Sequence, residues 1–225
     1  MNNNLSHISF IMDGNHRWSK KNNETKFDSY KRGAGKLLNL SKYLFENYDF
    51  KFISAFALST HNLKRSKDII NTIIDVLNFY LKKENIKKFN NFFDIEIRGN
   101  FNFLSDRLLK KKITELNSTK NNKKKLILFL NYSGQNDILN AYKNITKNNK
   151  SLNFRNFKMN LMTHDLPDPD LLVRSGGFQR LSDFMLFQIS FTELYFVKKL
   201  WPDITNNDLR KIINNYKSVE RKFGI

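Results

Sequence analysis

Three short segments of the chain combine charged side chains with glycine or hydroxyl residues in a pattern that suits phosphate binding. The first is Asp13–Trp18 (DGNHRW), which follows the apolar segment Ile8–Met12. A strand that turns at a glycine into a helix presents unpaired backbone N–H groups and a positive helix end to an anion. Arg17 would add a charged hydrogen bond, but Asp13 would repel a phosphate unless a divalent cation, commonly magnesium, lay between them. This pairing suggests a metal–diphosphate site, although Asp-Gly-Asn also occurs in ordinary turns.

The second segment is Ser59–Arg65 (STHNLKR), which follows the apolar segment Phe52–Leu58. Its hydroxyl groups, amide and arginine could bind an anion, or they could simply cap the helix expected to begin near Ser66. The residue types by themselves favour capping.

The third segment is Arg174–Ser182 (RSGGFQRLS), at the end of the apolar segment Leu171–Arg174. Arginine binds phosphate through two parallel N–H donors, and glycine lets backbone N–H groups approach closely. The segment therefore predicts a clamp for a second phosphate group, with a turn held by surface ion pairs as the alternative.

Short β-rich apolar segments alternate with longer segments of helical period, which predicts an α/β fold with a central, mostly parallel sheet flanked by helices. In such sheets ligands collect beyond the carboxyl ends of the strands, where the three segments begin. Apolar residues from Ile69 to Leu81 form a stripe that either packs in the core or walls an apolar groove. The expected strands are Ile8–Met12, Phe52–Leu58, Ile95–Arg98, Leu126–Asn131 and Leu171–Arg174, with a further apolar stretch at Phe184–Phe196 and a last helix at Asp208–Val219.

The composition narrows the class of protein. The chain has 225 residues, a formal net charge of +18 and no cysteine, which excludes disulfide frameworks and cysteine-ligated metals. Without an internal repeat or linker, one domain spanning 1–225 is expected. The start does not resemble a signal peptide and no apolar run is long enough to span a membrane, so a cytoplasmic protein is expected.

The positive charge raises the possibility of a nucleic-acid partner. Many of the lysines, however, are scattered or lie in solvated runs, whereas four of the ten arginines, Arg17, Arg65, Arg174 and Arg180, fall in the three segments. No nucleic-acid partner is therefore expected. The charge would instead attract anionic substrates and, peripherally, an anionic membrane surface.

Several motifs together resemble the cis-prenyltransferase family and, within it, the undecaprenyl diphosphate synthases. They occur in order from about His7 to Gly224, over nearly the whole chain. The motifs are Ile11–Trp18, Ser59–Arg65, Asn131–Gly134, Leu166–Gly177, Gln179–Ser182, Glu193–Phe196, Leu200–Asp203 and Arg221–Gly224.

The resemblance implies a fold and an activity. It implies an apolar tunnel between sheet and helices, a homodimer, and magnesium as cofactor. The implied reaction condenses isopentenyl diphosphate units in cis configuration onto an allylic diphosphate, commonly farnesyl diphosphate, to give a polyprenyl diphosphate such as the undecaprenyl carrier of cell-wall glycans. The segment Arg221–Gly224 resembles the part that approaches the partner subunit's site.

The resemblance also implies roles for individual residues. Asp13 would hold magnesium and assist departure of the allylic diphosphate, Asn62 would aid proton removal, and Glu193 would help to coordinate magnesium. The implied substrate-binding residues are Gly14, Asn15, His16, Arg17, Trp18, Lys26, Tyr30, Ser59, Thr60, His61, Leu63, Arg65, Arg174, Arg180, Leu181 and Ser182.

Several positions depart from the family pattern, four of which bear most directly on the site. Lys26 stands where arginine is common, Tyr30 where histidine is usual, Leu63 where tryptophan is usual, and Phe178 where glutamate is usual. They leave substrate choice, rate and product length open. A non-catalytic partner subunit and a basic nucleic-acid-binding protein remain alternatives, but the presence of both Asp13 and Arg174 favours an active enzyme.

Overall fold

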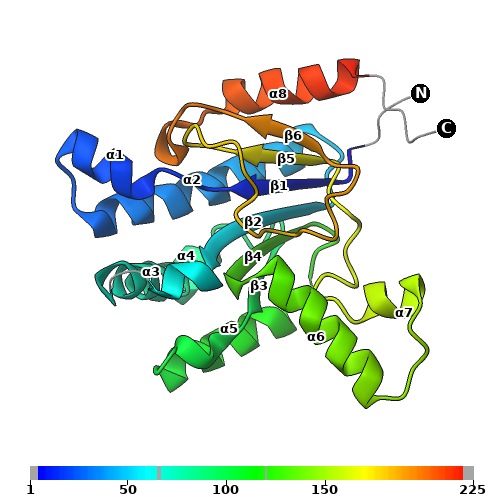
Figure 1. The fold of residues 1–225 in the computed structure, drawn as a ribbon. Helices are drawn as coiled ribbons and strands as arrows, with labels where there is room; N and C mark the ends of the chain where they lie inside the picture. Colours follow the sequence, from blue (N-terminus) through cyan, green and yellow to red (C-terminus); the bar gives the residue numbers. More distant parts are fainter. Residues whose placement is uncertain (1–4, 65–66, 120, 220–225) are drawn as a thin grey trace.

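The computed structural model describes residues 5–64, 67–119 and 121–219, and its centre is a six-stranded, entirely parallel sheet (Figure 1). The strand order is β3-β4-β2-β1-β5-β6. The strands are β1 (His7–Ile11), β2 (Phe52–Ser59), β3 (Asp94–Gly99), β4 (Lys125–Tyr132), β5 (Leu171–Arg174) and β6 (Glu193–Phe196). The predicted fold class is thus confirmed.

Helices connect and cover these strands. They are α1 (Asn15–Asn22), α2 (Lys26–Asn47), α3 (Lys67–Tyr80), α4 (Lys83–Ile86), α5 (Arg107–Ser118), α6 (Gly134–Lys147), α7 (Phe154–Met159) and α8 (Asn206–Ser218), with short 3-10 turns η1 (Thr60–Lys64), η2 (Phe101–Phe103) and η3 (Trp201–Asp203). The last helix begins with a capping box between Thr205 and Asp208. None of the helices in the described ranges is long and apolar enough to cross a membrane.

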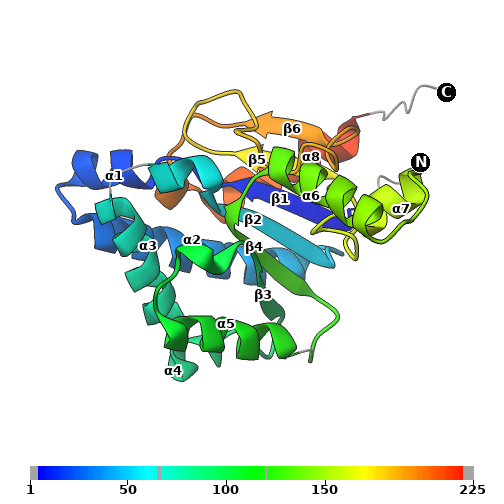
Figure 2. The same cartoon turned by 60° about the horizontal axis from the view of Figure 1, so that its bottom comes forward.

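The strands alternate their side chains between two apolar layers. In β1, Ile8 and Phe10 pack into the larger layer, which receives the buried faces of α2, α3, α5 and α8, while Ile11 points into the smaller layer. The smaller layer is completed by the irregular segment that carries Leu166 and Phe184. Figure 2 shows α6 and α7 in front of the strands and α2 behind them.

The sequence marked Phe184–Phe196 only as a further apolar stretch, and the structure forms a strand at its end alone, Glu193–Phe196. Phe184 and Met185 are fully buried against one face of the sheet, and the Phe184 ring stacks on Phe56 at 4.6 Å between centroids. An apolar run can be buried by packing over a sheet as well as by joining it, and its hydrophobicity does not distinguish the two.

A polar network is buried between the first two strands. The His7 ring lies 2.9 Å from the Ser54 hydroxyl through Nε2 and 2.7 Å from the Pro167 carbonyl oxygen through Nδ1. Ser9 and Ser54 share a hydrogen bond of 2.6 Å. Burial lowers the pKa of His7 from 6.5 to about 4, against the opposing effect of the Pro167 carbonyl. The histidine is therefore neutral at physiological pH.

This burial predicts an acid-sensitive stability. Because the unfolded chain takes up a proton on His7 near pH 6.5 and the folded chain only near pH 4, the free energy of unfolding should fall by about 3 kcal/mol as the pH is lowered across that window. Urea unfolding at a series of pH values measures this slope. His7→Gln should flatten it, whereas His164→Gln, at an exposed histidine, should not. An unchanged slope in His7→Gln would contradict the assignment.

Candidate active site

A cavity of about 440 Å³ lies between the sheet and helices α2 and α3, with its mouth at the carboxyl ends of β1, β2 and β5. Its wall is predominantly aliphatic and aromatic. The apolar wall residues include Leu37, Leu38, Phe56, Leu58, Ile69, Ile73, Val76, Leu77, Ile86, Phe89, Ile95, Ile97, Leu128 and Leu130. The apolar stripe of α3 therefore walls a groove, the second of its two interpretations.

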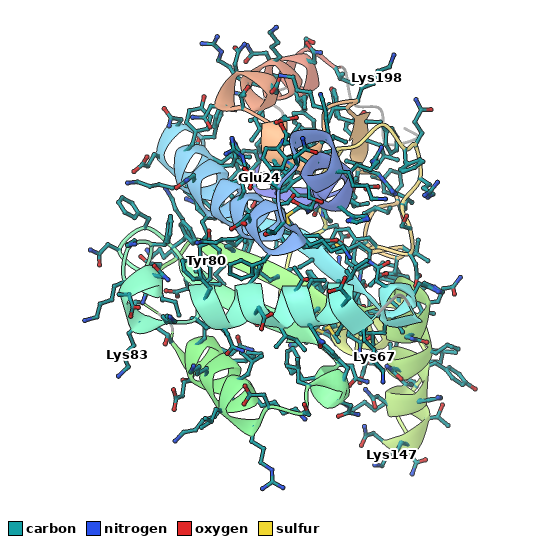
Figure 3. All side chains as sticks on the ribbon, turned by 90° about the vertical axis from the view of Figure 1, so that its left-hand side faces the viewer. Glu24, Lys67, Tyr80, Lys83, Lys147 and Lys198 are labelled. Atoms are coloured by element: carbon teal, nitrogen blue, oxygen red, sulfur yellow. The ribbon has the colours of Figure 1, made fainter. Side chains whose placement is uncertain are left out.

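Two polar side chains in the wall away from the mouth are bound to backbone. The Tyr80 hydroxyl, at the end of α3, donates to the Lys31 carbonyl of α2 at 2.9 Å, and Figure 3 shows Tyr80 where the two helices lie side by side. Burial raises the pKa of Tyr80, so the phenol is neutral. Asn85 donates to the Phe79 carbonyl at 2.8 Å. Their polar groups are satisfied by protein, and the cavity remains suited to a hydrocarbon chain.

The mouth is organised around Asp13, which follows β1. One carboxylate oxygen accepts a hydrogen bond from Arg174 Nη2 at 2.9 Å and the other lies 3.3 Å from Arg17 Nη2. Arg17 also donates to the Gly176 carbonyl at 2.7 Å. The parallel pairing of β1 with β5 brings Asp13 and Arg174 together, although they are 161 residues apart. The first and third predicted segments thus form one cluster.

The turn after β5 holds this cluster in place. Ser175 Oγ accepts from the Asp13 backbone N–H at 3.0 Å and donates to the Asp13 carbonyl at 2.8 Å. Gly176 has φ +85°, and a Cβ at this position would lie 2.4 Å from Arg17 Nη2. The glycine is therefore required by both its conformation and the closeness of the guanidinium.

Arg174 is the most buried charge at the mouth, with a side chain only 3% exposed. Its Nη1 donates to the Ser182 hydroxyl at 2.8 Å and to the Arg180 carbonyl. Its buried Nε has no hydrogen-bond partner among the described residues. A buried donor without a partner is costly, so this group is poised for an anion.

Helix α1 presents its amino-terminal end to the same mouth. Gly14, with φ +111°, precedes it and supplies no side-chain cap to the first N–H groups. The buried Oδ1 of Asn15 has no partner among the described residues, and it lies close to Gly33 of α2, where a Cβ would be 2.2 Å away. Trp18 does not line the cavity; it donates to Asp203 at 2.8 Å and so anchors α1 to η3.

The second segment contributes fewer residues than expected. Ser59 and Asn62 line the cavity, and Ser59 Oγ accepts from the Asn62 backbone N–H at 3.1 Å. Thr60, His61 and Leu63 are not in its wall.

His61 and Leu63 instead contact other parts of the protein. His61 Nε2 lies 3.7 Å from Asp183, and Leu63 packs against the main core. Arg65 lies outside the described residues, as does the Arg221–Gly224 segment.

Three other predicted residues also lie outside the cavity wall. Lys26 pairs with Asp68 and so joins α2 to α3, and Leu181 packs into the smaller apolar layer. Glu193 is in register with Leu171 at the start of β5, whereas Arg174 lies at its end. At 3.3 Å per residue, Glu193 is about 10 Å along the sheet from the mouth. Its metal-binding role stays a prediction.

The sequence interpretation missed several residues of the site. Gly33 and Trp201 line the cavity, and Ser175 positions Asp13 without having been singled out. Phe178 was noted only as a departure, yet its ring lies among the arginines of the mouth. Gly33 carried one usable signal, since a glycine inside a long helix often marks a close packing contact.

The donor set fits a magnesium ion held jointly with a diphosphate. No group of three or more histidine, aspartate or glutamate side chains in the described residues could hold a metal by itself. Asp13 is the one carboxylate among the described residues of the cavity wall, and its side chain is 27% exposed. Magnesium typically takes one or two carboxylates and completes its shell with water and substrate phosphates.

Comparisons with known proteins show the family and the fold to which the chain is similar. The family model described as "Putative undecaprenyl diphosphate synthase" matches residues 11–224. An isoprenyl transferase of Rickettsia typhi is 36% identical over 222 residues, covering 98% of each chain. The structure of lavandulyl diphosphate synthase from Lavandula x intermedia, in complex with dimethylallyl diphosphate, superposes with a TM-score of 0.88 at 28% identity over 99% of each chain. A probable undecaprenyl diphosphate synthase from Campylobacter jejuni gives 0.79 at 32% identity over 100% of each.

Fold, site and relatives together define a prenyltransferase, an enzyme of isoprenoid metabolism. More particularly, the chain belongs to the undecaprenyl diphosphate synthase family of isoprenyl transferases. The resemblance found in the sequence motifs is thereby confirmed, and cis-prenyl chain elongation is the activity that the family supports.

Proposed function

We propose that this enzyme condenses isopentenyl diphosphate units onto farnesyl diphosphate to give a cis-polyprenyl diphosphate, with undecaprenyl diphosphate as the expected product. The observation that carries the proposal is the cluster of Asp13, Arg17 and Arg174 at the mouth of an apolar cavity. Such a cluster can hold diphosphate groups while the attached hydrocarbon enters the cavity. The neighbouring structure bound to dimethylallyl diphosphate, which is an allylic diphosphate, is in keeping with this arrangement.

We assign one substrate to each side of the cluster. The allylic diphosphate would be held by Arg17 and the amino-terminal end of α1, near Asp13. Isopentenyl diphosphate would be held by Arg174, Arg180 and Ser182. Each charged hydrogen bond would contribute about 1.5–3 kcal/mol to binding.

The chemistry requires that negative charge develop on the departing diphosphate as the allylic carbon ionises. Guanidinium groups already held in place at the mouth stabilise that charge without reorganising. The apolar wall excludes water from the electron-poor carbon. The amide of Asn62, at the mouth beside Ser59, would position the group that accepts the proton lost from the condensing unit.

A magnesium ion held by Asp13 would supply further positive charge to the leaving diphosphate. Arg17 and Arg174 both contact the Asp13 carboxylate. A bound diphosphate would then accept hydrogen bonds from the same two guanidinium groups as the carboxylate.

Product analysis tests the proposal directly. Farnesyl diphosphate, labelled isopentenyl diphosphate and magnesium are mixed with the protein, and the butanol-extractable product is sized by chromatography after dephosphorylation. Incorporation into a long polyprenol supports the proposed function. Binding of isoprenoid without incorporation would instead identify a non-catalytic partner subunit. If the protein neither binds nor incorporates isoprenoid, both hypotheses are rejected.

We further propose a homodimer at the cytoplasmic face of a membrane. Large apolar side chains exposed on α6, α7 and the segment between them support self-association; they are Leu139, Tyr142, Leu152, Phe154 and Met159. The net charge of +18 supports attraction to anionic lipid. Light scattering coupled to size exclusion should give twice the 26.8 kDa chain mass, and sedimentation with anionic but not neutral vesicles should test the lipid contact.

A further inference from the structure

The ring of Phe178 lies against all three arginines of the mouth. The distance from the guanidinium carbon to the ring centroid is 4.2 Å for Arg180, 5.0 Å for Arg17 and 5.7 Å for Arg174. Phe178 lines the cavity and is 41% exposed. A large apolar side chain thus sits, partly open to water, at the centre of the most positive part of the site.

The three arginines differ in what else holds them. Arg17 and Arg174 share the Asp13 carboxylate, and each also donates to a backbone carbonyl. The side chain of Arg180 has no ion pair within the part of the chain that the structure describes, and its contact is the face of Phe178. The ring is therefore the feature that positions Arg180.

An aromatic ring and a carboxylate would hold a guanidinium in different ways. A carboxylate takes up N–H donors and neutralises the charge, so it competes with an incoming phosphate. A ring attracts the cation through its face and uses none of the five N–H donors, which lie in the guanidinium plane. Stacking on Phe178 leaves the donors and the charge of Arg180 available to a diphosphate.

The backbone before Phe178 fixes the ring over the arginines. Gly176 and Gly177 both have positive φ, +85° and +83°, which turns the chain back toward Arg174. Their N–H groups donate to the Lys199 carbonyl at 2.7 Å and the Val197 carbonyl at 2.9 Å. The turn that precedes Phe178 is thus anchored to the segment that follows β6.

We propose that Phe178 is a positioning residue that presents Arg180 to the diphosphate of isopentenyl diphosphate; this rests on the proposed function of the arginine cluster. The ring acts through Arg180 and does not touch the reacting carbons. It determines the affinity for this substrate, whereas Arg17 is held independently by Asp13 and Gly176. The effect on the allylic substrate is accordingly smaller.

The test compares Phe178→Leu and Phe178→Met, which lose the ring, with Phe178→Tyr, which keeps it. In steady-state assays the KM for isopentenyl diphosphate should rise about three- to tenfold in the first two, with kcat and the KM for farnesyl diphosphate changed less than twofold. Phe178→Tyr should stay within twofold of wild type. Phe92→Leu is the matched control, because Lys42 Nζ lies 3.8 Å from the Phe92 ring centroid, away from the cavity wall.

Calorimetry with inorganic pyrophosphate gives a readout that does not depend on turnover. Loss of affinity in Phe178→Leu, with retention in Phe178→Tyr and Phe92→Leu, supports the proposal. Wild-type KM and pyrophosphate affinity in Phe178→Leu, or an equal loss in Phe178→Tyr, would overturn it. If the wild-type protein binds pyrophosphate in this pattern but incorporates no isopentenyl diphosphate, the proposed function fails while the role of Phe178 stands.

Discussion

Asp13→Asn is expected to lower kcat by about 10³-fold while leaving the fold intact. Asp13 is the one carboxylate in the described cavity wall, and it joins Arg17 to the buried Arg174. The amide keeps the shape of the side chain but removes the negative charge that would hold magnesium and fix the two guanidinium groups. Incorporation of labelled isopentenyl diphosphate measures the loss, and circular dichroism verifies the fold.

Pyrophosphate binding separates this role from a merely structural one. In the wild-type protein magnesium should strengthen the binding of inorganic pyrophosphate, whereas in Asp13→Asn the affinity should be independent of magnesium because its protein ligand is missing. Asp165→Asn is the matched control, since Asp165 also pairs with a largely buried arginine, Arg98, at 2.6 Å. Wild-type turnover in Asp13→Asn, or an equal loss in Asp165→Asn, would contradict the assignment.

Arg174→Lys is expected to reduce kcat/KM for isopentenyl diphosphate by about 100-fold, although the charge is conserved. The guanidinium of Arg174 contacts Asp13, Ser182 and the Arg180 carbonyl at once, and its unpartnered Nε remains for substrate. An ammonium group cannot make this planar set of hydrogen bonds. Losing one to two charged hydrogen bonds to the transition state, partly replaced by lysine, corresponds to about 3 kcal/mol.

Arg98→Lys provides the comparison for this variant. Arg98 is likewise buried and multiply bonded, to Glu96 and Asp165, but it lies outside the cavity wall. Arg98→Lys should lower the midpoint of thermal unfolding while leaving kcat/KM for isopentenyl diphosphate nearly unchanged. If the two lysine variants lose the same activity at a temperature where both are folded, Arg174 has no special role at the mouth.

The local sequence pattern predicted the strands of the sheet well. Short β-rich apolar segments predicted five strands to within one residue, because strands of a parallel sheet that is covered on both faces form nearly continuous apolar runs. The apolar run at Phe184–Phe196 shows where this reasoning stops. Burial of Phe184 over Phe56 satisfies the same hydrophobicity without strand pairing.

The candidate site was only partly predictable for a related reason. Motif resemblance identified Asp13, Arg17 and Arg174, and these residues do meet. It also included Thr60 and Leu63, which lie outside the cavity wall, and Glu193, which lies at the other end of its strand. A motif specifies which residue types recur along the chain, whereas the direction of each side chain depends on the packing around it.

The sequence alone determined the fold class, the family and the charged residues available for diphosphate binding, because these follow from periodicity, residue type and order along the chain. Only the tertiary structure decided which of those residues lie together at the mouth of the cavity. Asp13 reaches Arg174 because β1 pairs with β5, and Phe178 covers three guanidinium groups because two glycines turn the chain back over them. Contacts between distant segments depend on strand order and backbone conformation, which no local pattern of residues encodes.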